Sequence, residues 1–417
     1  MSFISLVVFT FTGFVCIVVI KEALLIAYLL TVLFFAYEFI VRLVPGTQQA
    51  VLMEAFHLNH SQFAMLSSTS FVLPFTIMQF PVAFLLKQYH LKVVMSLSLT
   101  TCIIGCILMA VADNLSLIFL SRTMMGIGTA SAYLCVLESI QRFSKSTQTK
   151  TLIGLSTTIA FFITFLITPY LAKYTLLLGH QVIYLITAGV GSLLCASALI
   201  FIPDYTIEAT EQFGEIKKST AAIFSHRYII YSVIFSGMLY CPLEYICENE
   251  GMILFQSQGF SEWQASHMIS SMWLGYAMGT SLSCWLANYV SMYHVMKASS
   301  AISLLSLTLL IYGPIPSWHY PLSLCFGIAT GSHILTYYQL SLIPNTHLKT
   351  TALALNQVLL GTGMSITAPM IGLLIDYNRV YHNILSAYHL SLWMLVIIIL
   401  SSFFLAYQIH RNRQFSN

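Results

Sequence analysis

The sequence predicts an all-α membrane protein whose twelve spanning helices form two pseudo-symmetric bundles of six. Three observations support this prediction. Hydrophobic residues make up 58% of the 417-residue chain and charged residues only 7%, so the mean hydropathy reaches +0.83. Apolar runs of about 20 residues, the length that a helix needs to cross a bilayer, recur along the chain. One extended polar stretch interrupts them and leaves six runs on either side.

Continuous apolar runs favour helices over the strands of a membrane barrel, because barrel strands alternate apolar and polar side chains. The twelve predicted spans cover residues 23–44, 61–86, 93–112, 115–141, 151–172, 182–202, 228–250, 263–287, 297–313, 320–342, 351–375 and 386–407. A further apolar stretch, Phe3 to Ile20, precedes the first span. It lacks the basic start and the cleavage site of a secretory signal, which argues against its removal. The stretch has three possible interpretations: a thirteenth helix, an interfacial helix, or the product of a wrongly chosen start codon.

The polar stretch between the sixth and seventh spans defines the predicted domains. They are an N-terminal hydrophobic extension at 1–22, a first six-helix bundle at 23–202, a cytoplasmic linker at 203–227, a second six-helix bundle at 228–407 and a cytoplasmic tail at 408–417. The sequences of the two bundles also resemble each other, because Pro169 and Pro369 lie at the same depth of the fifth and eleventh spans. Such internal duplication is typical of transporters, which bind their substrate near the membrane midplane between the repeats.

The distribution of basic residues predicts the orientation in the membrane. Most of the 17 lysines and arginines fall into loops on one side, if the span at 23–44 begins in the cytoplasm. Cytoplasmic loops are enriched in these residues, so we expect the start of the first span and the C-terminus to be cytoplasmic. The net charge of +3 then follows from membrane topology, and we expect no nucleic-acid partner.

Charged side chains within the spans are the strongest indication of a functional site, since each is costly in lipid unless it has a partner or faces water. Glu38 and Arg42 are four residues apart on one face of the first span, so they can pair. One interpretation is a self-neutralised pair at the membrane boundary, where the arginine reaches toward water. In the other, Arg42 holds a substrate carboxylate with its planar fork, and Glu38 binds a proton or an amine. Arg122 in the fourth span could bind a carboxylate or pack against backbone carbonyls.

The seventh span carries a second group of charges, all of them acidic. Glu244 and Glu248 are four residues apart, and Glu250 lies on another face of the helix. Three ionised carboxylates so close together in a dry segment would repel one another, so we expect at least one to bind a proton near neutral pH. The alternative is that the helix ends near Cys247 and leaves the acids in water.

Aromatic side chains of several spans could wall a pocket that offers both an apolar face and hydroxyl groups. They are Tyr37, Tyr240, Tyr245, Trp273, Tyr337 and Tyr338. Each of them could instead serve packing or lie at the membrane interface.

Three motifs carry a family resemblance. The first is Tyr37-Glu38-Phe39 with Arg42 and Pro45, the second runs from Arg122 to Gly126 and Gly128, and the third combines Asn356, Gly361, Pro369, Gly372 and Asp376. With these motifs, residues 23–407 resemble the major facilitator superfamily. The first and third motifs resemble in particular a branch that holds proteobacterial intraphagosomal amino-acid transporters and lysosomal dipeptide carriers.

This resemblance implies a central cavity lined by the first, fourth, seventh and tenth spans, and a place in a bacterial inner membrane. It adds Asn356 to the candidate binding residues. It also implies a gating loop after the second span, and here the chain departs from the family pattern. Lys87 stands where an aspartate is expected, Lys92 follows it, and Glu138 stands where a lysine is common. A swapped Lys87–Glu138 pair is one way in which such a gate could be kept.

We therefore expect a secondary active transporter that moves a small solute, an amino acid or a short peptide, by alternating access and together with protons. Arg42 or Arg122 would bind the carboxylate of the solute, and Glu244 or Glu248 its ammonium group. The first alternative is an exporter of drugs or siderophores. The second is a receptor or accessory subunit that has a transporter scaffold and carries nothing.

The sequence argues against an enzyme. It contains no P-loop for ATP, no HExxH pattern, no CxxC pair among its nine cysteines and no nucleophile with a matching base. We expect no cofactor and no metal. We expect a monomer whose partners are the solute, protons and the lipid bilayer.

Overall fold

The computed structural model describes residues 22–143, 149–203, 226–313, 315–343 and 346–413. These residues form helices and contain no strand, which confirms the predicted all-α class. Ten helices among them are long and apolar enough to cross a membrane. The predicted extension from Phe3 to Ile20 and most of the predicted linker at 203–227 lie outside the described residues.

The first half of the chain provides spans one to six. Span one is α2 (Glu22–Thr47), and the short α3 (Gln49–Ala55) follows it. Span two consists of α4 (His60–Ala64), η1 (Met65–Thr69) and α5 (Ser70–Gln88). Span three is α6 (Leu91–Val111), and span four consists of α7 (Leu115–Thr129) and α8 (Ala132–Phe143). Spans five and six are α9 (Thr149–Leu178) and α10 (His180–Phe201).

The second half repeats this order. Span seven consists of α12 (Arg227–Tyr245), η3 (Ile246–Glu250) and α13 (Gly251–Ser257). Spans eight and nine are α14 (Glu262–Leu286) and α15 (Met292–Tyr312), and after the short η4 (Pro316–Trp318) span ten consists of α16 (His319–Thr330), η5 (Gly331–His333) and α17 (Ile334–Ser341). Span eleven is α18 (Thr346–Arg379), and span twelve consists of α19 (Ile384–Ser391) and α20 (Trp393–Arg413). Span eight (α14) and span ten (α16 to α17) complete the twelve, although they are less apolar than the other ten.

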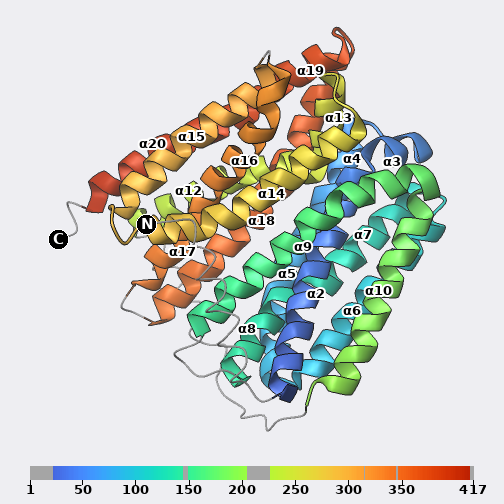
Figure 1. Ribbon diagram of the computed structural model, residues 1–417, viewed down its shortest axis with the longest axis vertical. Coiled ribbons are helices and arrows are strands. Elements are labelled where there is room, and N and C mark those ends of the chain that lie inside the picture. The colour runs from blue at the N-terminus through green and yellow to red at the C-terminus, as the bar shows by residue number, and fades with distance from the viewer. Residues whose placement is uncertain (1–21, 144–148, 204–225, 314, 344–345, 414–417) are drawn as a thin grey trace.

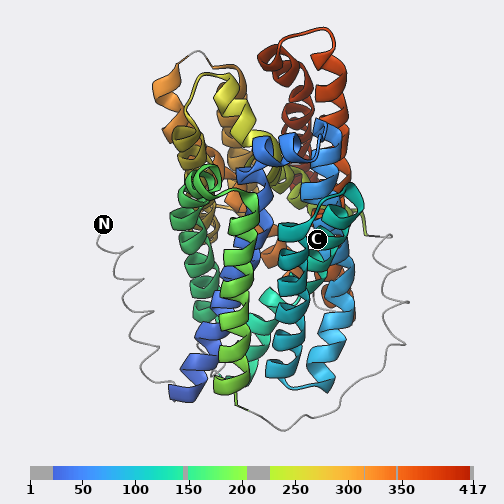
Figure 2. The ribbon, with the colours of Figure 1, turned by 90° about the vertical axis from the view of Figure 1, so that its right-hand side faces the viewer.

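The two halves lie side by side as separate helical bundles (Figure 1). The helices of the first half, blue to green, run roughly along one direction (Figure 2). We name the two ends of the molecule by their short helices. The α3 end carries α3, α4, α13 and α19, and the α8 end carries α8 and α17 (Figure 1).

The seventh span does not end near Cys247. Its helix continues through the π-helical turn η3 and through α13 to Ser257. Glu244, Glu248 and Glu250 are therefore all buried, and the alternative that leaves these acids in water does not hold.

The fourth and tenth spans are both interrupted midway, a shared feature that hydropathy alone did not predict. The fourth span breaks between α7 and α8, and the tenth passes through the 3₁₀ turn η5. A glycine just before each break allows close helix packing. Gly126 faces the backbone of Phe71, and Gly327 faces the backbone of Met272 in the equivalent helix of the other half, each too closely for a β-carbon. Small residues at such crossings are typical of membrane bundles.

The halves contact each other through α9 with α14, through α2 with η3, and through α18 with α4, η1 and α5. Small residues again allow the approach: a β-carbon on Gly46 would lie 2.6 Å from the carbonyl oxygen of Glu248. The hydroxyl of Ser270 donates to the carbonyl of Phe165 at 2.6 Å. By contrast, α8 and α17 pack against helices of their own halves. The structure thus shows the halves joined toward the α3 end.

Candidate functional site

Four charged side chains meet where the two halves join, and we name them the Arg42 cluster. They are Glu38 and Arg42 of α2, Glu244 of α12 and Glu248 of η3. Arg42 Nε donates to Glu248 Oε2 at 2.9 Å, and another nitrogen of its guanidinium, Nη2, pairs with Glu244. Arg42 Nη1 lies 4.0 Å from Glu38 Oε1. All four residues are buried, so one guanidinium serves three carboxylates away from bulk water.

The Arg42 cluster leaves some of its acceptor capacity unused. Among the described residues, Oε1 of Glu38 and Oε2 of Glu244 accept no hydrogen bond. A buried carboxylate oxygen without a donor is costly. These oxygens are therefore places where a proton or a cationic group would be stabilised.

A π-helical turn explains how one short segment reaches several partners. In η3, three consecutive residues contact the first half. Glu248 pairs with Arg42, Asn249 bonds to Ser67 and Ser68, and Glu250 bonds to His60. In an ideal α-helix, consecutive side chains point about 100° apart, and a π-turn, a feature often found at functional sites, changes this spacing. Ser67 and Ser68 lie in η1, so a π-helix of each half takes part.

A second polar group, which we name the His60 cluster, closes the α3 end. It consists of His60, Glu250, Asp376, Arg379 and Tyr388. His60 Nδ1 lies 3.1 Å from Glu250 Oε1, and Arg379 Nη1 lies 2.9 Å from His60 Nε2. The Asp376 carboxylate accepts the backbone N–H groups of His60 and Ser61 at 2.8 and 2.9 Å and so caps α4. The Tyr388 hydroxyl also donates to Glu250.

Arg122 lies apart from both clusters, inside the first half. Two nitrogens of its guanidinium donate to the carbonyls of Val41 and Ser67, each at 3.0 Å. The same guanidinium lies 4.4 Å from the centre of the Phe71 ring. Of the two interpretations of Arg122, the described contacts match packing against carbonyls.

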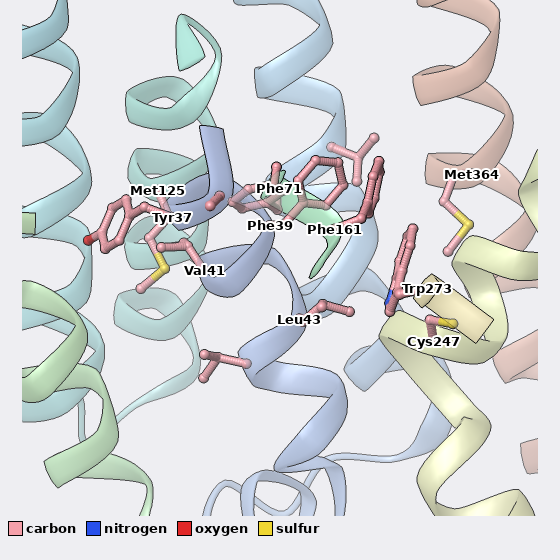
Figure 3. Close-up of a cluster of buried hydrophobic side chains, with 14 of the residues drawn as sticks. Tyr37, Phe39, Val41, Leu43, Phe71, Met125, Phe161, Cys247, Trp273 and Met364 are labelled. Atoms are coloured by element: carbon pink, nitrogen blue, oxygen red, sulfur yellow. The ribbon is translucent and has the colours of Figure 1, made fainter. Parts of the chain in front are cut away.

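Aromatic rings of α2, α9 and α14 pack together at the contact between the halves. Phe39 and Phe161 lie toward Trp273 (Figure 3), and the Phe161 and Trp273 rings stack at 5.4 Å. Farther along, Tyr240 stacks on the buried ring of His333 at 4.8 Å. Tyr240 is buried close enough to Arg42 and Glu248 to interact with their charges, and Tyr245 is buried close to Glu250.

The structure does not bring Tyr37 and Tyr338 to the cluster. Tyr37 lies on a different face of α2 from Glu38 and therefore points into the first half. There its hydroxyl donates to the carbonyl of Thr187 at 3.1 Å. Tyr338 is 53% exposed. Tyr337 donates to Gln357, and Asn356 is buried beside the Tyr337 hydroxyl, with no well-formed hydrogen bond of its own among the described residues.

The predicted gating residues lie at the α8 end. Lys87 is exposed in the last turn of α5, Lys92 lies in the first turn of α6, and Glu138 is half-buried in α8. The ion pairs of the described residues do not join Lys87 to Glu138. The swapped pair is therefore not formed in this conformation.

Sequence reasoning missed His60, Gln49, Asn249 and Arg379. Each is an ordinary loop or helix-end residue by pattern, and its partner lies in the other half of the chain. The one available signal was Asp376, which the third motif contains. A half-buried aspartate at the end of a span requires donors, and here α4 supplies them.

A comparison with protein families finds that the model of the Major Facilitator Superfamily matches residues 24–369. The chain belongs to the Major Facilitator Superfamily. It is accordingly a multi-pass integral membrane protein and a secondary transporter of small molecules. A comparison with curated proteins gives no match.

Two solved structures illustrate the shared architecture of this superfamily member. A bacterial homologue of the human lysosomal transporter Spinster, in an inward-facing and unoccupied conformation, matches with a TM-score of 0.73 and 13% identity, over 94% of this chain and 98% of that chain. The nucleoside transporter NupG matches with a TM-score of 0.72 and 13% identity, over 94% and 99% of the two chains. At such low identity these likenesses bear on the fold, and they confirm the twelve-helix arrangement.

Proposed function

We propose that this transporter carries a small zwitterionic solute, an amino acid or a short peptide, by alternating access and together with protons. The observation that supports this proposal most directly is the Arg42 cluster. Its guanidinium belongs to the first half, and two of its three carboxylates belong to the second half.

The charge balance of the cluster favours a proton or an ammonium group as a ligand. Three buried carboxylates face one guanidinium, so the cluster carries excess negative charge if all three are ionised. Such an excess is unfavourable away from water. It is relieved when a carboxylate takes up a proton, or when the ammonium group of a solute binds beside Glu38 and Glu244.

The carboxylate of the solute would bind Arg42. A guanidinium presents a planar fork that matches a carboxylate, and it stays protonated. The carboxylate of a bound solute would thus compete with Glu244 or Glu248 for the guanidinium of Arg42. Because these pairs join the two halves, their exchange changes the contacts that hold the halves together, which is the kind of differential contact that alternating access requires.

We further propose that the α3 end faces the outside and the α8 end the cytoplasm, in a bacterial inner membrane and with the protein as a monomer. The positions of the basic residues support this orientation, since Lys87, Lys92, Lys297 and Arg411 belong to helix ends on the α8 side. The described conformation is then closed toward the outside.

Uptake into proteoliposomes tests the proposed site. Removal of one partner of a buried, hydrogen-bonded charge pair costs at least about 2 kcal/mol, so Arg42→Gln and Glu248→Gln should each lower uptake of the transported amino acid or dipeptide at least about 30-fold. Matched controls are Arg411→Gln and Glu54→Gln, which change exposed residues and should leave uptake unchanged.

Two outcomes would contradict the proposal. If both cluster variants keep full uptake, the site assignment is wrong. If the purified protein transports bulky drugs or siderophores and ignores amino acids and dipeptides, the solute class is wrong.

A further inference from the structure

The His60 cluster is not needed to bind the proposed solute, yet it joins buried, charged groups of both halves. His60 belongs to α4 in the first half, and Glu250, Asp376, Arg379 and Tyr388 belong to the second half. His60 and Glu250 are fully buried, whereas Arg379 is exposed at the end of α18. An ionisable histidine at this position suggests a role that depends on protonation.

The hydrogen bonds define which form of His60 the closed α3 end contains. Arg379 Nη1 always carries hydrogen, since a guanidinium does not lose its proton in proteins. At 2.9 Å from it, His60 Nε2 must therefore accept, and so it carries no proton. His60 Nδ1 then carries the ring hydrogen and donates to Glu250. The closed end thus contains the neutral Nδ1–H tautomer of His60.

The surroundings of Glu250 agree with this assignment. The Gln49 amide and the Tyr388 hydroxyl also donate to Glu250, so this carboxylate accepts from three donors. The other ionisable groups that face the pair are Asp376 and Arg379 of α18 and Tyr245 of α12. Asp376 is engaged by two backbone N–H groups.

A proton on His60 would turn its contact with Arg379 from attractive to repulsive. Nε2–H would then face Arg379 Nη1–H, two donors and two positive charges within hydrogen-bonding distance. Arg379 is exposed and can leave for water, whereas the His60–Glu250 and Asp376 contacts survive protonation. Acid therefore removes one of the links between α4 and α18 and weakens the closure of the α3 end without abolishing it.

We infer that His60 is a proton-binding site that controls the α3 end: the neutral imidazole holds Arg379 and keeps this end closed, and the imidazolium releases Arg379 and favours opening. The π-turn η3 connects this site to the Arg42 cluster, since Glu250 and Glu248 are two residues apart on it. A proton that arrives from the α3 end would thus act on the same segment as the solute. The inference goes beyond the proposed function and holds for any solute.

Distance measurements between spin labels test the inference on the full-length protein in lipid nanodiscs, with no solute present. Labels at Leu177 and Val380, both exposed at the α3 end and in different halves, report its opening; Cys16 and the exposed Cys284 and Cys325 are first replaced by serine. We expect the population with long distances to rise about threefold as the pH falls through the histidine range, from about 8 to about 5.

Variants of His60 and Arg379 give different expected patterns. His60→Gln keeps one donor and one acceptor without a titratable proton, so the long-distance population should stay low at every pH. Arg379→Gln removes the group that is expelled, so this population should already be raised at neutral pH and should not rise further in acid. His382→Gln changes an exposed histidine at the same end and should keep the response of the parent protein.

The inference is overturned if the parent protein shows no change across this pH range, or if His60→Gln responds to acid as the parent does. The pH series on the parent protein decides the question even if the His60 or the Arg379 variant does not fold. Because no solute is present, failure here leaves the proposed solute and its site standing, and failed uptake of amino acids leaves this inference standing.

Discussion

At the scale of single residues, the boundary between the halves depends on a few side chains whose pairing is not local. The sequence predicted that Glu38 and Arg42 share one face of α2, because a four-residue spacing is a local property of a helix. It could not predict that Arg42 pairs with Glu248, which lies 206 residues away. Tyr37 shows the opposite error. Its place in a motif beside Glu38 suggested that it belongs to the site, but neighbouring residues of a helix point in different directions, and Tyr37 points into the first half.

Gly46 offers a test at this scale. In Gly46→Ala, the new β-carbon would lie 2.6 Å from the carbonyl oxygen of Glu248, so η3 must move away from α2 and the Arg42–Glu248 pair must lengthen. We expect a loss of about 1–3 kcal/mol in the free energy of unfolding, as for other overpacked sites, together with reduced uptake. Thermal unfolding in detergent and proteoliposome uptake measure the two effects.

Gly189→Ala is the matched control. A β-carbon at Gly189 meets nothing within 4 Å, and an alanine in a helix is more stable than a glycine by about 0.5–1 kcal/mol. Equal behaviour of the two alanine variants would show that the close contact at Gly46 is unimportant.

At the scale of elements, hydropathy predicted where the spans lie but not where their helices change form. The π-turns η1 and η3 and the breaks in the fourth and tenth spans arise from packing against other helices, which an apolar run does not record. The seventh span illustrates the difference: its acids left open whether the helix ends near Cys247, and the structure shows that it continues through η3 with the acids buried.

Arg122 tests a structural role at this scale. It ties α7 to α2 and η1 through backbone carbonyls, so Arg122→Gln should lower the free energy of unfolding by about 3 kcal/mol, the cost of buried carbonyls left without donors. The folded fraction should bind solute with unchanged affinity. Thermal unfolding and a binding titration on the same sample separate these effects.

Arg42→Gln should instead show a large loss of affinity in the fraction that folds. If Arg122→Gln instead lowers affinity and leaves unfolding unchanged, Arg122 belongs to the binding site, and the carbonyl contacts are not its role.

At the scale of the whole molecule, the twelve spans and the division into two bundles were predictable, because length and apolarity are properties of each segment alone. The site was predictable only in part. Its acids and its arginine stood out as charges in apolar helices, whereas the His60 cluster is built by contacts between the halves and had one signal in the sequence, Asp376 of the third motif. In the described conformation, η3 contributes Glu248 to one cluster and Glu250 to the other.

The central claim is that a zwitterionic solute and a proton share the buried carboxylates that join the halves. Proteoliposomes with a trapped pH dye test it most directly, when amino acids and dipeptides are added under an imposed proton gradient. We predict that the transported solute carries protons inward in the parent protein and in Glu54→Gln, and that Glu248→Gln moves none. Solute uptake without any proton movement in the parent protein would contradict this account.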